Sequence, residues 1–90
     1  MVKSLHCVVT GKVQGVNFRS ETQSYASAHH LTGWVRNLDS DKVEVLAQGE
    51  ETSLEELKKF LVRGSAMSKV EHVECDTIDY DKDYDAFQIR

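Results

Sequence analysis

The chain has 90 residues, of which 40% are hydrophobic and 29% charged, and its formal net charge at pH 7 is −4. This length suits one small core, so we expect residues 1–90 to form a single domain. The acidic balance argues against a nucleic-acid partner, which needs a basic face. No apolar run approaches the ~20 residues that cross a bilayer. Residues Met1–Ser4 lack the apolar region of a signal peptide. We therefore expect no membrane partner and a cytoplasmic location.

The first third of the chain predicts a strand, a loop and a helix. Apolar residues alternate with other residues over 3–10, which is typical of a strand. The segment Gly11–Arg19 follows as a loop. From about residue 18 to residue 30, apolar and small side chains recur at helical spacing. The face that they form consists of Phe18, Thr22, Tyr25, Ala26 and His29.

The middle of the chain predicts a hairpin of two strands, residues 33–38 and 42–49. Asp39–Asp41 makes a turn between them, because aspartate side chains bond well to local backbone. In the first of these strands, alternation places Val35 and Asn37 on one face. Trp34, Arg36 and Leu38 then lie on the other face.

A second helix and two extended segments complete the chain. Either Thr52 or Ser53 fits the first residue of a capping box, and Gly64 fits a helix end. The apolar stripe between them consists of Leu54, Leu57, Phe60 and Leu61. Residues 66–78 and 86–90 read as extended. The order is β-α-β-β-α-β plus a short terminal strand, which predicts a ferredoxin-like α/β sandwich with two helices on one face of an antiparallel sheet.

Several conspicuous residues receive structural interpretations. Cys7 and Cys75 lack the CxxC spacing of a zinc or redox site, and we expect two buried free thiols. The two residues could lie on neighbouring strands. His29 and His30 are adjacent on a helix, so they point apart and suit a helix end better than a metal site. The acidic residues from 76 to 85 lack the glycine and glutamate of a calcium loop. We expect a solvated loop there, held to the sheet by Tyr80 and Tyr84.

The loop before the first helix has the chemistry of an anion site. Glycines permit a close backbone approach to a ligand, and both Gly11 and Gly15 were candidates for that role. A helix that opens from such a loop presents several N–H groups and partial positive charge. Arg19 adds a planar fork of donors that suits two phosphate oxygens. We name residues 14–19 (Gln14, Gly15, Val16, Asn17, Phe18 and Arg19) the cradle and predict that it binds phosphate.

The motifs also carry a family resemblance. Gly11–Arg19 (GKVQGVNFR) strongly resembles the signature of the acylphosphatases, and Leu31–Asn37 (LTGWVRN) is similar to their second motif. Val43–Val45, Gly49–Glu50 and Phe87–Arg90 are also similar, so the resemblance covers nearly the whole chain. Asn17 departs from it, since the family often has glycine or an aromatic residue there. The change is tolerated if only the backbone N–H of residue 17 contacts phosphate.

The resemblance implies the same fold and an acylphosphatase, a hydrolase that acts on the acid anhydrides called acyl phosphates. Arg19 and the cradle would bind the phosphoryl group, and Asn37 would orient the attacking water. Neither motif contains a serine, cysteine or histidine nucleophile, so we expect no covalent intermediate and no metal or other cofactor. A substrate oxygen would take the proton of the water. The products would be a carboxylate, which leaves without protonation, and inorganic phosphate.

Two other classes of function compete with this one. Small ferredoxin-like domains also bind ligands without chemistry, so a non-catalytic anion-binding module is the first alternative. An RNA-binding module of similar topology is the second, but it needs exposed aromatic residues on its central strands and a basic face. We expect a monomer, because both helices use their apolar stripes within the domain. The expected ligands are a small acyl phosphate and phosphate.

Overall fold

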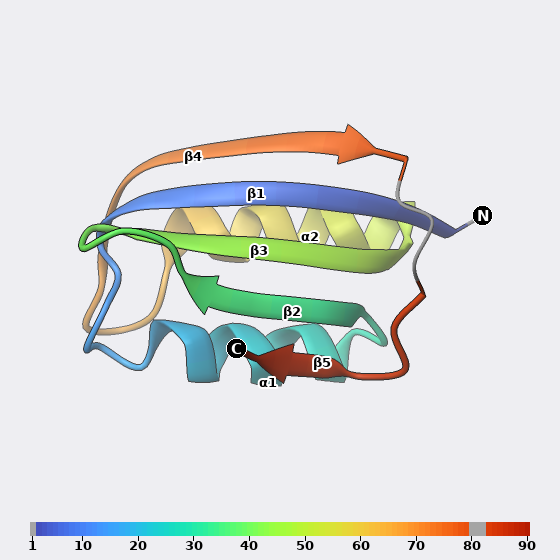
Figure 1. The fold of residues 1–90 in the computed structure, drawn as a ribbon, viewed down its shortest axis with the longest axis horizontal. Coiled ribbons are helices and arrows are strands. Elements are labelled where there is room, and N and C mark those ends of the chain that lie inside the picture. Colours follow the sequence, from blue (N-terminus) through green and yellow to red (C-terminus); the bar gives the residue numbers. More distant parts are fainter. Residues whose placement is uncertain (1, 80–82) are drawn as a thin grey trace.

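A computed structural model describes residues 2–79 and 83–90, and in it two helices cover one face of a five-stranded sheet (Figure 1). The strands are β1 (Val2–Lys12), β2 (Thr32–Asn37), β3 (Lys42–Glu50), β4 (Lys69–Ile78) and β5 (Phe87–Ile89). The helices are α1 (Phe18–Ala28) and α2 (Glu51–Arg63). The strand order is β4-β1-β3-β2-β5. The ferredoxin-like α+β fold is thereby confirmed.

One feature of the predicted sheet is wrong, because the sheet is mixed and not wholly antiparallel. β1 pairs antiparallel with β3 and β4, and β2 pairs antiparallel with β3. The short β5 instead runs parallel to β2, with Phe87 opposite Gly33 and Ile89 opposite Val35. The direction of a three-residue edge strand depends on where the preceding loop delivers it, and no alternation pattern encodes that.

The core lies between the sheet and the helices, on the faces that the apolar patterns predict. The odd-numbered positions of β1 point inward, and Cys7 and Val9 have no exposed surface. The predicted stripe of α2 is buried throughout. α2 packs on β1, β3 and β4, whereas α1 packs on β2 and β5. Neither helix is long and apolar enough to span a membrane, within the residues described.

The helix ends differ in part from the prediction. α2 begins at Glu51, directly after β3, and its cap residue Glu50 makes no side-chain capping bond. The predicted start at Thr52 or Ser53 is therefore wrong, because the sheet delivers the chain straight into the helix without a loop. Gly64 ends α2 as predicted, with a φ of 75° and its N–H bonded to Phe60 O at 2.7 Å.

Gly11 has a structural role that the sequence did not reveal. β1 continues through it to Lys12, with a shift in register against β4 between Thr10 and Gly11. A Cβ at Gly11 would lie 2.2 Å from Lys69 O of β4. The missing side chain thus permits two strands to approach closely, and this contact accounts for Gly11 without a ligand.

Cys7 and Cys75 form a disulfide, so the prediction of free thiols is wrong. The two residues lie directly opposite each other in the β1–β4 pairing, with Cα atoms 4.1 Å apart. Their position on neighbouring strands was foreseen. Burial is expected for a free thiol and for a disulfide alike, so it did not distinguish them. The disulfide forms because the β1–β4 register places the two cysteines opposite each other.

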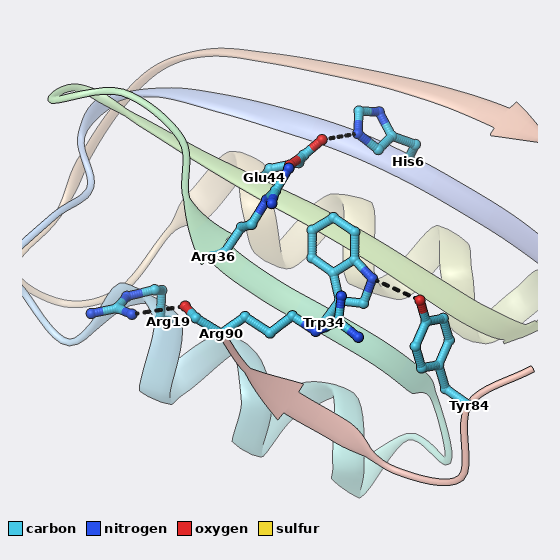
Figure 2. Close-up of polar contacts among 7 residues, drawn as sticks. All are labelled: His6, Arg19, Trp34, Arg36, Glu44, Tyr84 and Arg90. Carbon is cyan, nitrogen blue, oxygen red and sulfur yellow. Dashed lines mark hydrogen bonds and ion pairs between the residues drawn. The ribbon is translucent and has the colours of Figure 1, made fainter. Parts of the chain in front are cut away.

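The helix-free face of the sheet is covered by its own side chains (Figure 2). Trp34 is only 7% exposed because the guanidinium groups of Arg36 and Arg90 lie over its ring, at 5.1 and 5.2 Å from the centroid. Trp34 Nε1 donates to Tyr84 Oη at 3.2 Å, so Tyr84 holds its loop to the sheet as expected. Tyr80, the other residue of that prediction, lies outside the described residues.

Candidate active site

The cradle forms a short run of turns between β1 and α1 whose N–H groups are free to bind an anion. Gly15 and Asn17 both have left-handed backbone, with φ of 72° and 61°. Asparagine is one of the few residues other than glycine that adopts this conformation readily. Among the described residues, the N–H groups of residues 15–20 have no hydrogen-bond acceptor. The first that has one is Glu21, bonded to Asn17 O at 3.0 Å.

The Asn17 side chain leaves these N–H groups uncovered. An asparagine before a helix often caps it, but this one makes no capping hydrogen bond. The free N–H groups at the start of α1 and the helix dipole act in the same direction, and both favour a bound anion. The geometry is that of a phosphate-binding nest at a helix N-terminus.

Two contacts hold the cradle to the body of the protein on the side of α2. Phe18 is 1% exposed, and its ring packs against Phe60 of α2 with centroids 6.4 Å apart. Val16 O accepts a hydrogen bond from Ser65 Oγ at 3.1 Å, in the connection between α2 and β4. Phe18 and Val16 therefore anchor the loop through packing and main-chain contact, and their side chains are not aimed at a ligand.

On the other side, the cradle is attached to the β2–β3 turn by Gln14. Its side-chain amide nitrogen donates to Asp39 O and to Lys42 O, the latter at 2.9 Å. Figure 1 shows that the β1–α1, β2–β3 and α2–β4 connections all gather at the same end of the molecule, on the left of the view. The β2–β3 and α2–β4 connections thus hold the loop that carries the predicted phosphate site.

Arg19 is oriented by Arg90, the residue that follows β5. Its Nη1 donates to the main-chain oxygen of Arg90 at 3.3 Å, and Figure 2 shows the guanidinium beside that oxygen. Arg90 is itself tied to the sheet, because its N–H donates to Val35 O at 2.9 Å. One turn further along α1, Gln23 Nε2 donates to Phe87 O at 3.0 Å, which fixes the helix to β5. The half-exposed guanidinium is therefore held in one orientation, while its remaining N–H donors stay available to a ligand.

A cavity of about 260 Å³ lies at the cradle. Four predicted phosphate ligands contribute to its wall. The residues that line it are Val13, Gly15, Asn17, Phe18, Arg19, Ser20 and Ile89. Ser20 is the one hydroxyl among them, and neither a histidine nor a carboxylate is present to activate it. Backbone N–H groups and one guanidinium thus dominate the polar chemistry of this wall.

Asn37 is not among the residues that line this cavity; the lining residue Ile89 lies opposite Val35, two residues before Asn37 in β2. Asn37 is exposed at the end of β2, opposite Val43 of β3, and it immediately precedes the turn that Gln14 contacts. Its side chain follows that of Val35 on the helix-covered face, as the alternation predicts. Arg36 points to the other face and makes an ion pair with Glu44 at 2.6 Å, so it has no part in this arrangement.

Glu44 is the one described group with a clearly displaced pKa. Burial of its carboxylate would raise the pKa, but hydrogen bonds from His6 and Arg36, and the charges of both, lower it below the ordinary value of 4.5. His6 Nε2 lies 2.6 Å from one carboxylate oxygen, and Arg36 Nε donates to the other (Figure 2). These contacts stabilise the helix-free face, away from the cradle.

Fold and site together define a class: a small ferredoxin-like domain with a run of unpaired N–H groups at the start of its first helix. The model of the acylphosphatase family matches residues 5–89. An acylphosphatase of Bacillus licheniformis is 46% identical over 81 residues, which are 90% of this chain and 87% of that protein. One of Nitrosococcus oceani is 42% identical over 79 residues, 88% of this chain and 89% of the relative.

The solved structures agree with these relatives. An acylphosphatase from Coxiella burnetii superposes with a TM-score of 0.94 at 38% identity, covering 99% of this chain and 93% of the other. A structure of the Bacillus subtilis acylphosphatase gives a TM-score of 0.93 at 34% identity, with 100% and 99% covered. The chain belongs to the acylphosphatase family, hydrolases that act on the acid anhydride bond of acyl phosphates.

Three contacts of the site were missed at the level of sequence. They are the Gln14 amide on the β2–β3 turn, the Ser65 hydroxyl on Val16 and the Arg90 main-chain oxygen at Arg19. Each joins residues at least 25 positions apart, and in all three the acceptor is a main-chain oxygen, which residue type does not reveal. Only Gln14 offered a signal of such a contact in the sequence. It is a long polar side chain in a loop whose predicted ligand contacts are made by the backbone.

Proposed function

We propose that the cradle and Arg19 bind the phosphoryl group of an acyl phosphate, and that a water oriented by Asn37 attacks the phosphorus directly. The observation that carries this proposal is the run of unpaired N–H groups at residues 15–20 next to the directed guanidinium of Arg19. Phosphoryl transfer through a loose transition state needs mainly positioned donors and charge stabilisation.

The reaction requires little from the protein beyond this arrangement. The attacking water forms a bond to phosphorus while the bond to the carboxyl oxygen breaks and its electron pair leaves with the carboxylate. That carboxylate needs no proton near neutral pH. A phosphoryl oxygen of the substrate accepts the proton of the water, and inorganic phosphate is the second product. The mechanism uses no covalent intermediate, no metal and no other cofactor.

Asn37 is assigned to the water because of its position. It is exposed at the end of β2, two residues after Val35, whose strand partner Ile89 lines the cavity, and its amide can both donate and accept. The cradle already supplies the donors that an anion needs. The Asn37 amide is therefore better suited to orient the attacking water.

The test is hydrolysis of an aromatic acyl phosphate, followed by ultraviolet absorbance in the presence of a chelator. The wild type should turn over, and Arg19→Ala should lose at least about 100-fold in kcat/KM because the largest local positive charge is gone. Arg63→Ala removes the same group from the end of α2 and should behave as wild type. Phosphate inhibition without turnover in the wild type would indicate a non-catalytic anion-binding module. Turnover that chelator abolishes and metal restores would refute the metal-free mechanism.

We also propose that residues 1–90 act as one monomeric unit in the cytoplasm. The exposed large apolar side chains are scattered over separate elements and form no stripe, which supports a monomer. They are Val2, Leu38, Val62, Met67 and Ile89. The Cys7–Cys75 disulfide weighs against the cytoplasm, because disulfides persist mainly in oxidising compartments. Sedimentation equilibrium tests the first point, and cell fractionation tests the second.

A further inference from the structure

We propose that Gln14 is a positioning residue, which fixes the β2–β3 turn, and with it Asn37, relative to the cradle. This inference rests on the proposed role of Asn37 in orienting water. It assigns to the Gln14 side chain a task separate from that of the backbone around it, whose N–H groups face the predicted phosphate.

The contacts of Gln14 are those of a bridge between two segments. The side chain leaves the cradle and ends against the turn, 25 to 28 positions further along the chain, where Nε2 donates to Asp39 O and Lys42 O. An amide NH₂ carries two hydrogens, so it can serve both oxygens at once. Lys42 O also accepts from Leu38 N at 3.0 Å. Gln14 thereby binds the oxygen that closes the turn.

The turn has few other attachments in the part of the chain that the structure describes. Its residues 38–41 are all exposed, and its internal Lys42 N to Asp39 O contact is long, at 3.4 Å. The remaining link is from Gly11 N to Asp41 O at 2.9 Å. Of these two links among the described residues, one comes from Gly11 of β1 and the other from Gln14, so Gln14 is the residue that joins the turn to the cradle itself.

Asn37 is the residue whose position depends most directly on the β2–β3 turn. It is the last residue of β2, so the turn governs one of its two flanking peptides. If the turn moves away from the cradle, the Asn37 amide moves away from the cavity, whereas the N–H groups of residues 15–20 stay where Phe18 and Ser65 hold them. Loss of the Gln14 amide should therefore impair attack by water and spare phosphate binding.

The experiment compares Gln14→Met, Gln14→Glu and the control Gln88→Met. Methionine keeps the length without donors, and glutamate places acceptors against two carbonyl oxygens. Gln88 is exposed on β5 and remote from the turn. We expect kcat to fall about 10- to 100-fold in Gln14→Met, as for a displaced catalytic group, and further in Gln14→Glu. The phosphate inhibition constant should change little, and Gln88→Met should match wild type.

Two further measurements separate positioning from general damage. The Leu38 N–H, bonded to Lys42 O, should exchange with solvent faster in Gln14→Met, because the turn opens more readily. In an Asn37→Ala background, Gln14→Met should have little additional effect on turnover, since the two residues act in series. Unchanged kcat in both Gln14 variants, equal loss of turnover and phosphate inhibition, or full additivity with Asn37→Ala would each overturn the proposal.

The outcomes also distinguish this inference from the proposed function. If Asn37→Ala leaves kcat unchanged, the role assigned to Asn37 is wrong and the inference falls with it. If Asn37→Ala abolishes turnover while Gln14→Met does not reduce it, the proposed function stands and only the inference about Gln14 fails.

Discussion

Arg19 and Arg90 are joined by a hydrogen bond in which the side chain of one residue meets the main chain of the other. Nη1 of Arg19 lies 3.3 Å from the main-chain oxygen of Arg90. The Arg90 side chain extends away over Trp34 and Tyr84, with its guanidinium 5.2 and 5.5 Å from their ring centroids. Arg90 therefore connects the predicted phosphate-binding arginine to the helix-free face of the sheet.

This connection predicts different effects for two changes at residue 90. Deletion of Arg90 removes the oxygen that directs Arg19, and kcat/KM should fall by about 10- to 100-fold. Arg90→Ala keeps the main chain and loses only the stacking, so its effect on kcat/KM should be much smaller. Steady-state kinetics with an aromatic acyl phosphate measures both. Equal losses would mean that the side chain, and not the main-chain oxygen, governs Arg19.

Asn37→Ala should separate turnover from binding. The change leaves the cradle and Arg19 intact but removes the amide proposed to orient water, so kcat should fall by about 100- to 1,000-fold. Competitive inhibition by inorganic phosphate should remain. Inhibition assays and isothermal titration with phosphate provide the comparison. A parallel loss of phosphate affinity would show that Asn37 belongs to the anion site itself.

Substitutions at Asn17 should follow backbone conformation and not side-chain chemistry. Its φ of 61° is readily adopted by glycine and asparagine but strained for other residues. Asn17→Gly should retain activity, while Asn17→Val should lose about 1–2 kcal/mol of folding free energy and part of its phosphate affinity. Urea unfolding and phosphate titration of the two variants test this. If Asn17→Gly loses turnover, the side chain has a direct role.

The Cys7–Cys75 disulfide should stabilise the fold without affecting the chemistry. It closes a loop with a sequence separation of 68 residues. Chain-entropy estimates give about 4 kcal/mol for a loop of that length. Reduction, or Cys75→Ala, should lower the urea midpoint, while kcat of the folded protein stays unchanged. Alkylation followed by mass spectrometry reports the thiols. Freely reactive thiols in the native protein, with no response to reductant, would contradict the assignment.

Acid should destabilise the protein partly through Glu44. The pKa of this carboxyl is lower in the folded state than its ordinary value of 4.5. Its contribution is therefore complete above that value and is lost as the pH falls through the lower folded-state pKa. Unfolding free energies between about pH 5 and pH 3 should decline less steeply in Glu44→Gln than in wild type. Glu71→Gln, at an exposed carboxyl of β4, serves as the control.

The sequence was informative wherever local periodicity decided the structure. The stripe of α2, the inward positions of β1 and the opposed faces of Val35 and Trp34 all follow from spacing, because each element buries one face. The start of α2 was missed because β3 passes into the helix without a loop, so tertiary context outweighs the capping signal of Thr52 or Ser53.

The candidate site shows the same division. The loop and the helix that follows it could be predicted, because their signals are neighbours in sequence, whereas phosphate binding by residues 14–19 stays a prediction. What orients the loop was not readable, because Gln14, Ser65 and Arg90 act on residues far away along the chain. Gly11 shows a further reason: a residue without a side chain signals a close approach but does not say whether a ligand or another strand approaches.

The hydrogen bond between residues 19 and 90 also has a consequence for how the protein is made. A ribosome adds Arg90, whose main-chain oxygen accepts from Arg19, 71 residues after Arg19 itself. A nascent chain can therefore complete its sheet core and both helices while its arginine is still undirected. If Arg19 binds the phosphoryl group as proposed, it would take up its orientation only once β5 lies beside β2.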